Sequence, residues 1–282
     1  MELQYDGAGL HGWAKQERLA TVEGGLEAAF KVALGHSPSL RVAGRTDAGV
    51  HARRQVVSLL LPQGVDRRGL LRSLNALTPA GIRVSRLTPA PAGFDARKDA
   101  VSRTYRYFVC PEAVASPFWA PYSWQVRGPL DLNAMREAAG LVEGRHDFAA
   151  FTPTKTEHVF FHKTVIRCGW TRGRTGPLQA GTWTMEIEAD AFLRHMVRIL
   201  VGAMVEIGQG VRSIENLERA LSGASREDMG LTAPAHGLFL WDIRYPARAG
   251  DPPVDAGFGP PLRLDTPGGL HYHVRSRLKE AV

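Results

Sequence analysis

Residues 43–52 read Ala43-Gly44-Arg45-Thr46-Asp47-Ala48-Gly49-Val50-His51-Ala52, and the start of a β-strand follows them at Gln55-Val56-Val57. Two glycines bracket an Arg-x-Asp, and glycine permits backbone angles and close approaches that other residues do not. We therefore expect Asp47 on a tight loop that is fixed by the strand behind it. Arg45 is a candidate to keep this carboxylate ionised and oriented. A structural turn with an Arg45–Asp47 ion pair is the alternative that the residues alone leave open.

Strands are predicted on both sides of this loop. Residues 182–189 alternate polar and apolar without a break, which indicates one buried face and one face that meets solvent or ligand. Residues 101–109 are rich in β-branched and aromatic side chains, and residues 56–61 form a short apolar run that suits a central strand. Two further strands are predicted at 162–170 and 238–245. Together with helices, this pattern predicts an α+β fold with mainly antiparallel sheets.

Helices with one apolar face are predicted at residues 22–33, 131–142 and 213–221. The longest helical pattern runs over residues 192–207. In such a helix Arg194 and Arg198 would lie one turn apart and face the same cleft.

Proline and glycine divide the chain. We expect an N-terminal α+β half at residues 1–110 with the Asp47 loop, a proline-rich connecting segment at 111–130, and a C-terminal α+β half at 131–246. From residue 246 to residue 269 there are six Pro and five Gly in 24 residues. This composition predicts a flexible C-terminal extension at residues 247–282.

The charge and the composition narrow the class of partner. A net charge of +7 and a pI of 9.7 favour anionic partners, above all nucleic acid. No apolar run approaches the ~20 residues that span a bilayer, and the first residues do not resemble a secretory signal. We therefore expect a cytoplasmic protein that does not bind a membrane. Two Cys and ten His show no metal-ligand spacing, so no metal is expected.

The stretch at 43–52 resembles the signature loop of the TruA family of tRNA pseudouridine synthases, and further blocks follow in the order of that family. These blocks are Tyr5-Asp6-Gly7 with Gly12-Trp13, Gln16 and Thr21-Val22-Glu23; Phe94-Asp95-Ala96-Arg97 with Ser102-Arg103-Thr104-Tyr105-Arg106-Tyr107; His146-Asp147-Phe148 with Phe151; Ala191-Phe192-Leu193-Arg194-His195-Met196-Val197-Arg198 with Val201-Gly202; and Ala233-Pro234 with Gly237-Leu238, Leu240 and Tyr245-Pro246.

Three features depart from the family pattern. Ala14 stands where members usually carry Gln. The first predicted strand begins almost at Met1, which indicates a shortened start or a truncated chain. The residues beyond about 246 have no counterpart in the pattern.

The resemblance implies the pseudouridine synthase fold, in which two similar halves join their sheets around a central basic RNA-binding cleft. It implies an isomerase that converts uridine to pseudouridine in the anticodon stem-loop of tRNA, at tRNA positions 38, 39 and 40. A homodimer in which each tRNA contacts both subunits is also implied. No cofactor is expected, because the product is an isomer of the substrate.

The resemblance also assigns roles to single residues. It implies that Asp47 is the catalytic aspartate, that Tyr105 packs against the target base, and that Arg198 reaches the aspartate. We add Arg45 to this catalytic set and interpret His195 as a packed or surface histidine. The residues that match RNA-contacting segments are Phe94, Ala96, Arg97, Lys98 and Lys155.

Alternatives of three kinds stay open. A synthase of the same family with a different RNA target would share every residue named above. An N-glycosidase that uses the same carboxylate would release free uracil. A non-catalytic RNA-binding module is disfavoured because Arg45, Asp47, Tyr105 and Arg198 are all present. For the synthase itself, the carboxylate either attacks C1′ of the ribose or accepts a proton from C2′.

Overall fold

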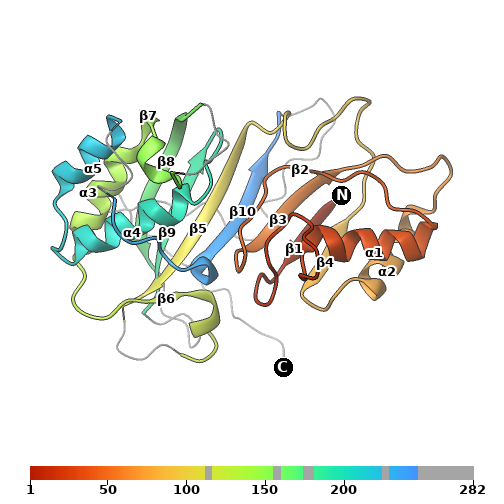
Figure 1. Cartoon of the computed structure of the whole chain (residues 1–282), viewed down its shortest axis with the longest axis horizontal. Helices are drawn as coiled ribbons and strands as arrows, with labels where there is room; N and C mark the ends of the chain where they lie inside the picture. The colour runs from red at the N-terminus through yellow and green to blue at the C-terminus, as the bar shows by residue number, and fades with distance from the viewer. Residues whose placement is uncertain (112–115, 155–159, 174–180, 224–228, 247–282) are drawn as a thin grey trace, which may run out of the picture.

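The computed structural model describes residues 1–111, 116–154, 160–173, 181–223 and 229–246. These residues form one mixed α/β structure around a ten-stranded sheet in which most neighbours are antiparallel, as predicted. Figure 1 shows helices at both ends of this sheet and long strands between them. The extension predicted at 247–282 lies outside the described residues.

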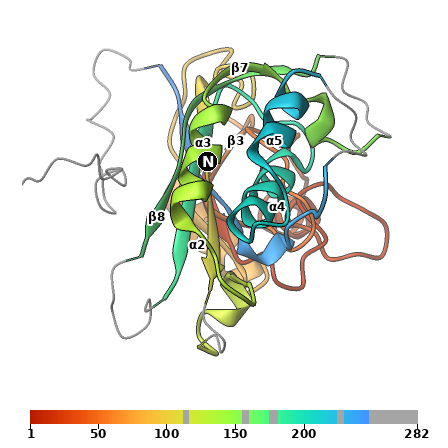
Figure 2. The ribbon, with the colours of Figure 1, turned by 90° about the vertical axis from the view of Figure 1, so that its left-hand side faces the viewer.

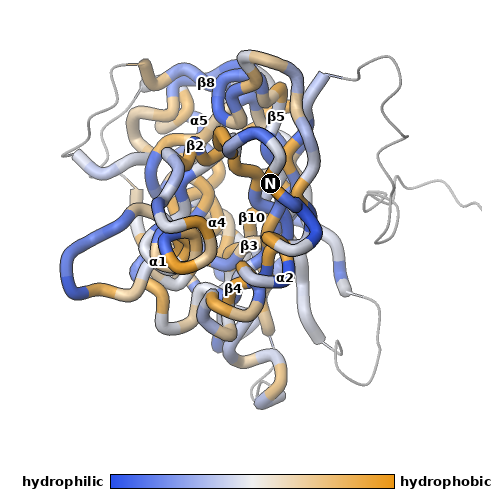
Figure 3. Tube along the Cα trace, turned by 90° about the vertical axis from the view of Figure 1, so that its right-hand side faces the viewer, coloured by the Kyte–Doolittle hydropathy of each residue, from blue (hydrophilic) through white to orange (hydrophobic). Residues whose placement is uncertain are grey.

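The N-terminal end of the sheet consists of β1 (Glu2–Tyr5), β2 (Arg41–Val42), β3 (His51–Ser58) and β4 (Ile82–Arg86). It is accompanied by α1 (Val22–Leu34), whose N-cap is Thr21, and by α2 (Arg67–Leu77), whose N-cap is Asp66. The two helices pack on each other, and α2 packs on β4. In Figure 3 the hydrophobic segments of this end gather around α1 and the strands, whereas hydrophilic segments form outer loops.

The other end consists of β7 (Gly144–Asp147), β8 (His162–Arg172) and β9 (Trp183–Ala189). Three helices accompany them: α3 (Leu132–Val142), α4 (Met196–Gly208) and α5 (Ile214–Leu221). Figure 2 looks onto this end, where α3 packs on β8, α4 and α5. The buried side of α4 is almost wholly apolar, and it therefore fixes one wall of the core.

Three strands complete the centre: β5 (Ser102–Cys110), the short β6 (Trp124–Gln125) and β10 (Leu238–Arg244). The strand order is β4-β1-β3-β10-β5-β9-β8-β7, with β2 beside β3 and β6 beside β5. The last strand, β10, is parallel to β3 and antiparallel to β5, so it joins the two ends of the sheet. Its register pairs Leu240 with Ala52 on one side and with Tyr105 on the other.

Most of the predicted elements are confirmed. The helices at 22–33, 131–142 and 213–221 correspond to α1, α3 and α5, and the strands predicted at 101–109, 162–170, 182–189 and 238–245 correspond to β5, β8, β9 and β10. The strand predicted at 56–61 is β3, but it begins earlier, at His51, and ends at Ser58. The structure adds α2 and four strands, β2, β4, β6 and β7, which the sequence did not predict. In α2 only Leu70 and Leu74 are buried, and three arginines and a glycine interrupt its apolar pattern.

β9 is buried on both faces, although its alternation predicted one face open to solvent or ligand. Its Glu186 and Glu188 are only 4% and 5% exposed. Arg106 Nε lies 2.6 Å from the Glu186 carboxylate, and Arg167 contacts both glutamates at 2.6 and 3.6 Å. Glu188 also accepts a hydrogen bond from Ser102 Oγ at 2.6 Å. The prediction was wrong because carboxylates with charged and hydrogen-bonding partners can be buried.

The helix predicted at 192–207 begins later, at Met196. His195 immediately before it has φ 62° and ψ −3°, a left-handed conformation that cannot continue an α-helix. Arg194 therefore lies in a turn outside α4, and the prediction of Arg194 and Arg198 on one helical face is wrong.

Candidate active site

The loop at residues 43–50 joins β2 to β3. Within it the Val50 N–H donates to the Asp47 carbonyl oxygen at 3.2 Å. Gly49 between them has φ 77°, the left-handed conformation expected for a glycine in a tight turn. The backbone that carries the Asp47 side chain is therefore fixed by a turn at the start of a central strand.

A buried chain of hydrogen bonds supports this loop. Gln55 Nε2 donates to the Gly44 carbonyl oxygen at 2.7 Å and to the Tyr5 hydroxyl at 3.3 Å. The Tyr5 hydroxyl and Thr46 Oγ1 share a hydrogen bond at 2.8 Å, in which either oxygen can donate. The backbone N–H of Trp13 donates a hydrogen bond to the Thr46 carbonyl oxygen at 3.0 Å. Thr46, the residue before Asp47, is thus fixed through both its side chain and its backbone.

The Asp47 carboxylate contacts two groups at the start of α4. Its Oδ2 lies 3.5 Å from Arg198 Nη1 and 3.5 Å from His195 Nε2. Arg198 is itself fixed, because its Nε donates to the Ala233 carbonyl at 2.7 Å and its own carbonyl accepts the Ala233 N–H at 3.1 Å. The Asp47 side chain remains 29% exposed. A ligand can therefore reach a carboxylate that the protein already orients.

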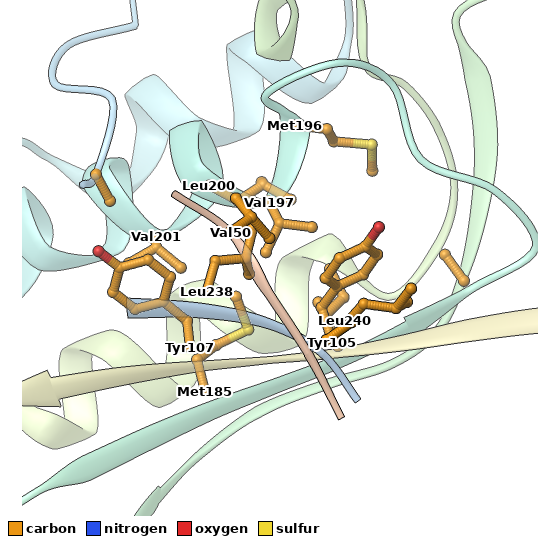
Figure 4. Packing of buried hydrophobic residues seen from close by; sticks show 14 of the residues in the cluster. Val50, Tyr105, Tyr107, Met185, Met196, Val197, Leu200, Val201, Leu238 and Leu240 are labelled. Carbon is orange, nitrogen blue, oxygen red and sulfur yellow. The ribbon is translucent and has the colours of Figure 1, made fainter. Parts of the chain in front are cut away.

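Tyr105 lines the same pocket from β5. Its ring packs edge-on against Phe192, with the ring centroids 5.0 Å apart. Burial, reinforced by the nearby Tyr5 and Asp47, raises the pKa of Tyr105, so its phenol stays neutral in physiological conditions. Figure 4 shows its side chain among those of β10 and α4. A neutral aromatic ring beside a carboxylate suits a planar, polar ligand.

Arg45 and Arg194 also line this pocket. Arg194 shares it with Arg198 as predicted, although from a turn and not from the helix. Arg45 is exposed, and within the described ranges it forms no ion pair with Asp47. The expected Arg45–Asp47 contact is wrong, because the carboxylate faces α4, where Arg198 and His195 contact it. The alternative of a structural turn closed by that ion pair is excluded for the same reason.

The predicted RNA-contacting residues lie in different environments. Arg97 and Lys98 are exposed, and their backbone N–H groups donate to Asp95 Oδ1 at 2.9 and 3.1 Å. Phe94 is half-buried. Ala96 is completely buried, and both its N–H and its carbonyl are hydrogen-bonded within the protein. Ala96 therefore offers RNA no group, and Lys155 lies outside the described residues.

His195 is the residue of this site whose contact with Asp47 the sequence analysis did not predict. We interpreted it as a packed or surface histidine, yet its ring lies beside the Asp47 carboxylate. No spacing rule identifies it, because its position depends on a positive φ that a histidine rarely adopts. The chain of hydrogen bonds through Tyr5 and Gln55 was missed because it joins Tyr5 to Thr46 and Gln55, which lie 41 and 50 positions further along the sequence.

Neither a metal site nor a membrane span emerges from the part of the chain that the structure describes. In those residues, no three or more His, Cys, Asp or Glu side chains are grouped to hold a metal ion. No helix there combines the length and the apolar character that crossing a bilayer requires.

Known proteins resemble this chain over most of its length. Residues 138–246 match the family model described as tRNA pseudouridine synthase. The chain is 38% identical over 244 residues to the tRNA pseudouridine synthase A of Syntrophotalea carbinolica, which covers 86% of this chain and 94% of that protein. It is 40% identical over 256 residues to the protein of the same name from Streptomyces griseus, covering 88% of each chain. For that of Geobacter sp. the identity is 36% over 246 residues, covering 86% of this chain and 97% of the relative.

Proposed function

Because this chain belongs to the TruA family of tRNA pseudouridine synthases, which are isomerases, we propose that it converts uridine to pseudouridine in the anticodon stem-loop of tRNA. The target uridines are those that the family resemblance implies, at tRNA positions 38, 39 and 40. The observation that carries the proposal is the oriented and accessible Asp47 carboxylate, held at 3.5 Å by Arg198 in a pocket that Tyr105 also lines.

The reaction sets clear requirements for this pocket. The N1–C1′ bond of uridine breaks, the uracil turns, and C5 bonds to C1′; the proton lost from C5 is balanced by one gained at N1. Asp47 attacks C1′ or takes a proton from C2′, and it is ionised for either step. Arg198, 3.5 Å away, orients that carboxylate. No cofactor is needed, since no electrons are gained or lost.

The target base must leave the helical stack to reach Asp47. Tyr105 supplies a neutral aromatic surface against which the displaced uracil packs. Arg45 and Arg194, at the edge of the same pocket, supply positive charge near the flanking phosphates. We therefore assign Arg45 to the RNA rather than to the carboxylate.

The wider RNA-binding surface and the assembly are part of the same proposal. We infer that the α+β halves at 1–110 and 131–246, connected by 111–130, border a central basic cleft. Exposed Arg97 and Lys98, with Phe94 beside them and Lys155, contact RNA there, and the net charge of +7 favours this. We expect a cytoplasmic homodimer, for which light scattering would give twice 30.8 kDa, about 62 kDa.

An assay on unmodified tRNA transcripts tests the function. Pseudouridine mapped by carbodiimide-dependent stops of reverse transcription should appear in the anticodon stem-loop, and the RNA mass should stay unchanged. Stops elsewhere would identify a synthase of the same family with another RNA target. Release of free uracil would identify an N-glycosidase, and neither product from any tRNA would contradict the proposal.

Replacing Tyr5 by Phe should slow pseudouridine formation about three- to tenfold at saturating tRNA. The change removes the hydroxyl that bonds Thr46 and leaves one amide proton of Gln55 unpaired, so the loop next to Asp47 loosens. Burial raises the pKa of Tyr5 to about 12, so the hydroxyl is a neutral donor throughout the assay range.

Tyr245→Phe is the matched control for this variant. It also removes a tyrosine hydroxyl bonded inside the protein, here to the Ala96 carbonyl at 2.7 Å, but not beneath the Asp47 loop. Both variants should lose about 1–2 kcal/mol of unfolding free energy, and only Tyr5→Phe should lose rate. Equal rates in the two variants would show that the chain of hydrogen bonds stabilises the fold without positioning Asp47.

A further inference from the structure

His195 has an unfavourable backbone conformation at the edge of the pocket. Its φ of 62° lies in the left-handed region, where a side chain with a Cβ is disfavoured. Apart from glycines, Arg18 is the only other residue in the described ranges with a positive φ. Strained residues of this kind persist where the surrounding structure enforces them, and they cluster at functional sites.

The effect of this conformation is to aim the imidazole at the carboxylate. His195 Nε2 lies 3.5 Å from Asp47 Oδ2, and the His195 side chain is 25% exposed. Arg198 Nη1 reaches the same oxygen at the same distance. Both contacts fall on Oδ2. Neither of these two ion pairs involves the other carboxylate oxygen, Asp47 Oδ1.

We propose that His195 is a second positioning residue for Asp47. In its protonated form the imidazole shares Oδ2 with Arg198, which turns Oδ1 toward the ribose of the bound uridine. The inference rests on the proposed function, because it concerns how the same carboxylate is presented to its substrate. It also adds a consequence: the rate of the reaction depends on the charge of His195.

The charged and titratable groups around the His195 imidazole determine how its protonation, and with it the reaction rate, changes with pH. Asp47 favours the protonated imidazole, whereas Arg198, Arg194 and Arg45, which line the same pocket, disfavour it; Tyr105 is neutral. As pH rises through the titration of His195, Oδ2 loses one of its two cationic partners. The rate should therefore fall at alkaline pH, while at acidic pH it falls because Asp47 must be ionised.

The first test measures the His195–Asp47 contact and does not depend on pseudouridine formation. The imidazole signal of His195 is identified by NMR as the one that is missing from His195→Gln. Its titration is then followed in wild type and in Asp47→Asn. We expect the midpoint in wild type to be higher by about half a pH unit or more, because the carboxylate favours the charged imidazole. Equal midpoints in the two proteins would overturn the proposal.

The second test measures the single-turnover rate of pseudouridine formation. His195→Gly relieves the backbone strain and removes the side chain, whereas His195→Gln keeps a neutral donor of similar reach. At saturating tRNA we expect His195→Gly to lose about tenfold or more in single-turnover rate, with tRNA binding unchanged. His195→Gln should recover part of the rate and lose the fall in rate at alkaline pH, because its side chain does not titrate.

The outcomes separate this inference from the proposed function. A His195→Gly protein with the rate and pH profile of wild type would show that the histidine only fills a turn, and would overturn the inference alone. A wild-type protein that shows the NMR coupling but makes no pseudouridine would contradict the proposed function and leave the His195–Asp47 contact established.

Discussion

We expect Asp47→Asn protein to bind tRNA with an affinity within about twofold of wild type and to form pseudouridine more than about a thousandfold more slowly. The amide keeps the size and the shape of the carboxylate but carries no charge, so it neither attacks C1′ nor accepts a proton from C2′. Binding is spared because it depends on phosphate contacts distributed over a basic surface. The measurement pairs single-turnover pseudouridine formation with filter binding at a fixed salt concentration.

Asp242→Asn is the matched control for this variant. The Asp242 side chain is 31% exposed, close to the 29% of Asp47, and it too pairs with an arginine, since Arg54 Nη1 lies 2.7 Å from its Oδ1. Loss of that pair should cost at most about 1–2 kcal/mol and leave the rate unchanged. If Asp47→Asn is folded and still works at a rate near that of wild type, the mechanism is wrong.

Gly202→Ala is the substitution with the largest expected effect on stability, a loss of about 3 kcal/mol in unfolding free energy. A Cβ at this position of α4 would overlap the Leu231 carbonyl oxygen, and a backbone atom cannot rotate away as a side chain can. The segment that includes Ala233 must shift, and Ala233 is the partner that fixes Arg198. We therefore expect the rate to fall together with stability.

The same change at Gly140 provides the control. This glycine also lies inside a helix, α3, but it is exposed and a Cβ there would meet nothing within 4 Å. Gly140→Ala should stabilise the protein by about 0.5–1 kcal/mol, because alanine loses less entropy in a helix. Denaturant melts of both variants give the comparison. If Gly202→Ala is as stable as wild type, α4 and the segment at 231–233 pack less tightly than described.

The sequence predicted local structure better than it predicted pairing. Alternation located β9, β-branched and aromatic composition located β5, and apolar faces located α1 and α3, because these signals depend on neighbouring residues. The insertion of β10 between β3 and β5 pairs residues almost 190 positions apart, as in Leu240 with Ala52. No local pattern encodes such a pairing.

At the candidate site, too, local features were predicted better than contacts between distant residues. Glycine spacing alone drew attention to Asp47, but the residues by themselves left its partner open and favoured the wrong one, Arg45. Only the family resemblance connected Asp47 to Arg198 across 151 positions, and the structure brings the two within 3.5 Å. His195 escaped both arguments, because its contribution depends on a backbone conformation that its residue type disfavours.

The central position of β10 has a consequence for biosynthesis. On the ribosome the Asp47 loop and β5 are complete when less than half of the chain has been made, yet the strand that lies between β3 and β5 ends at Arg244. Until that strand emerges, both neighbours expose an unpaired edge, which is a hazard for association with other chains. The sheet beside the Asp47 loop therefore stays incomplete until Arg244 has been synthesised, so the site is assembled long after the loop itself has been made.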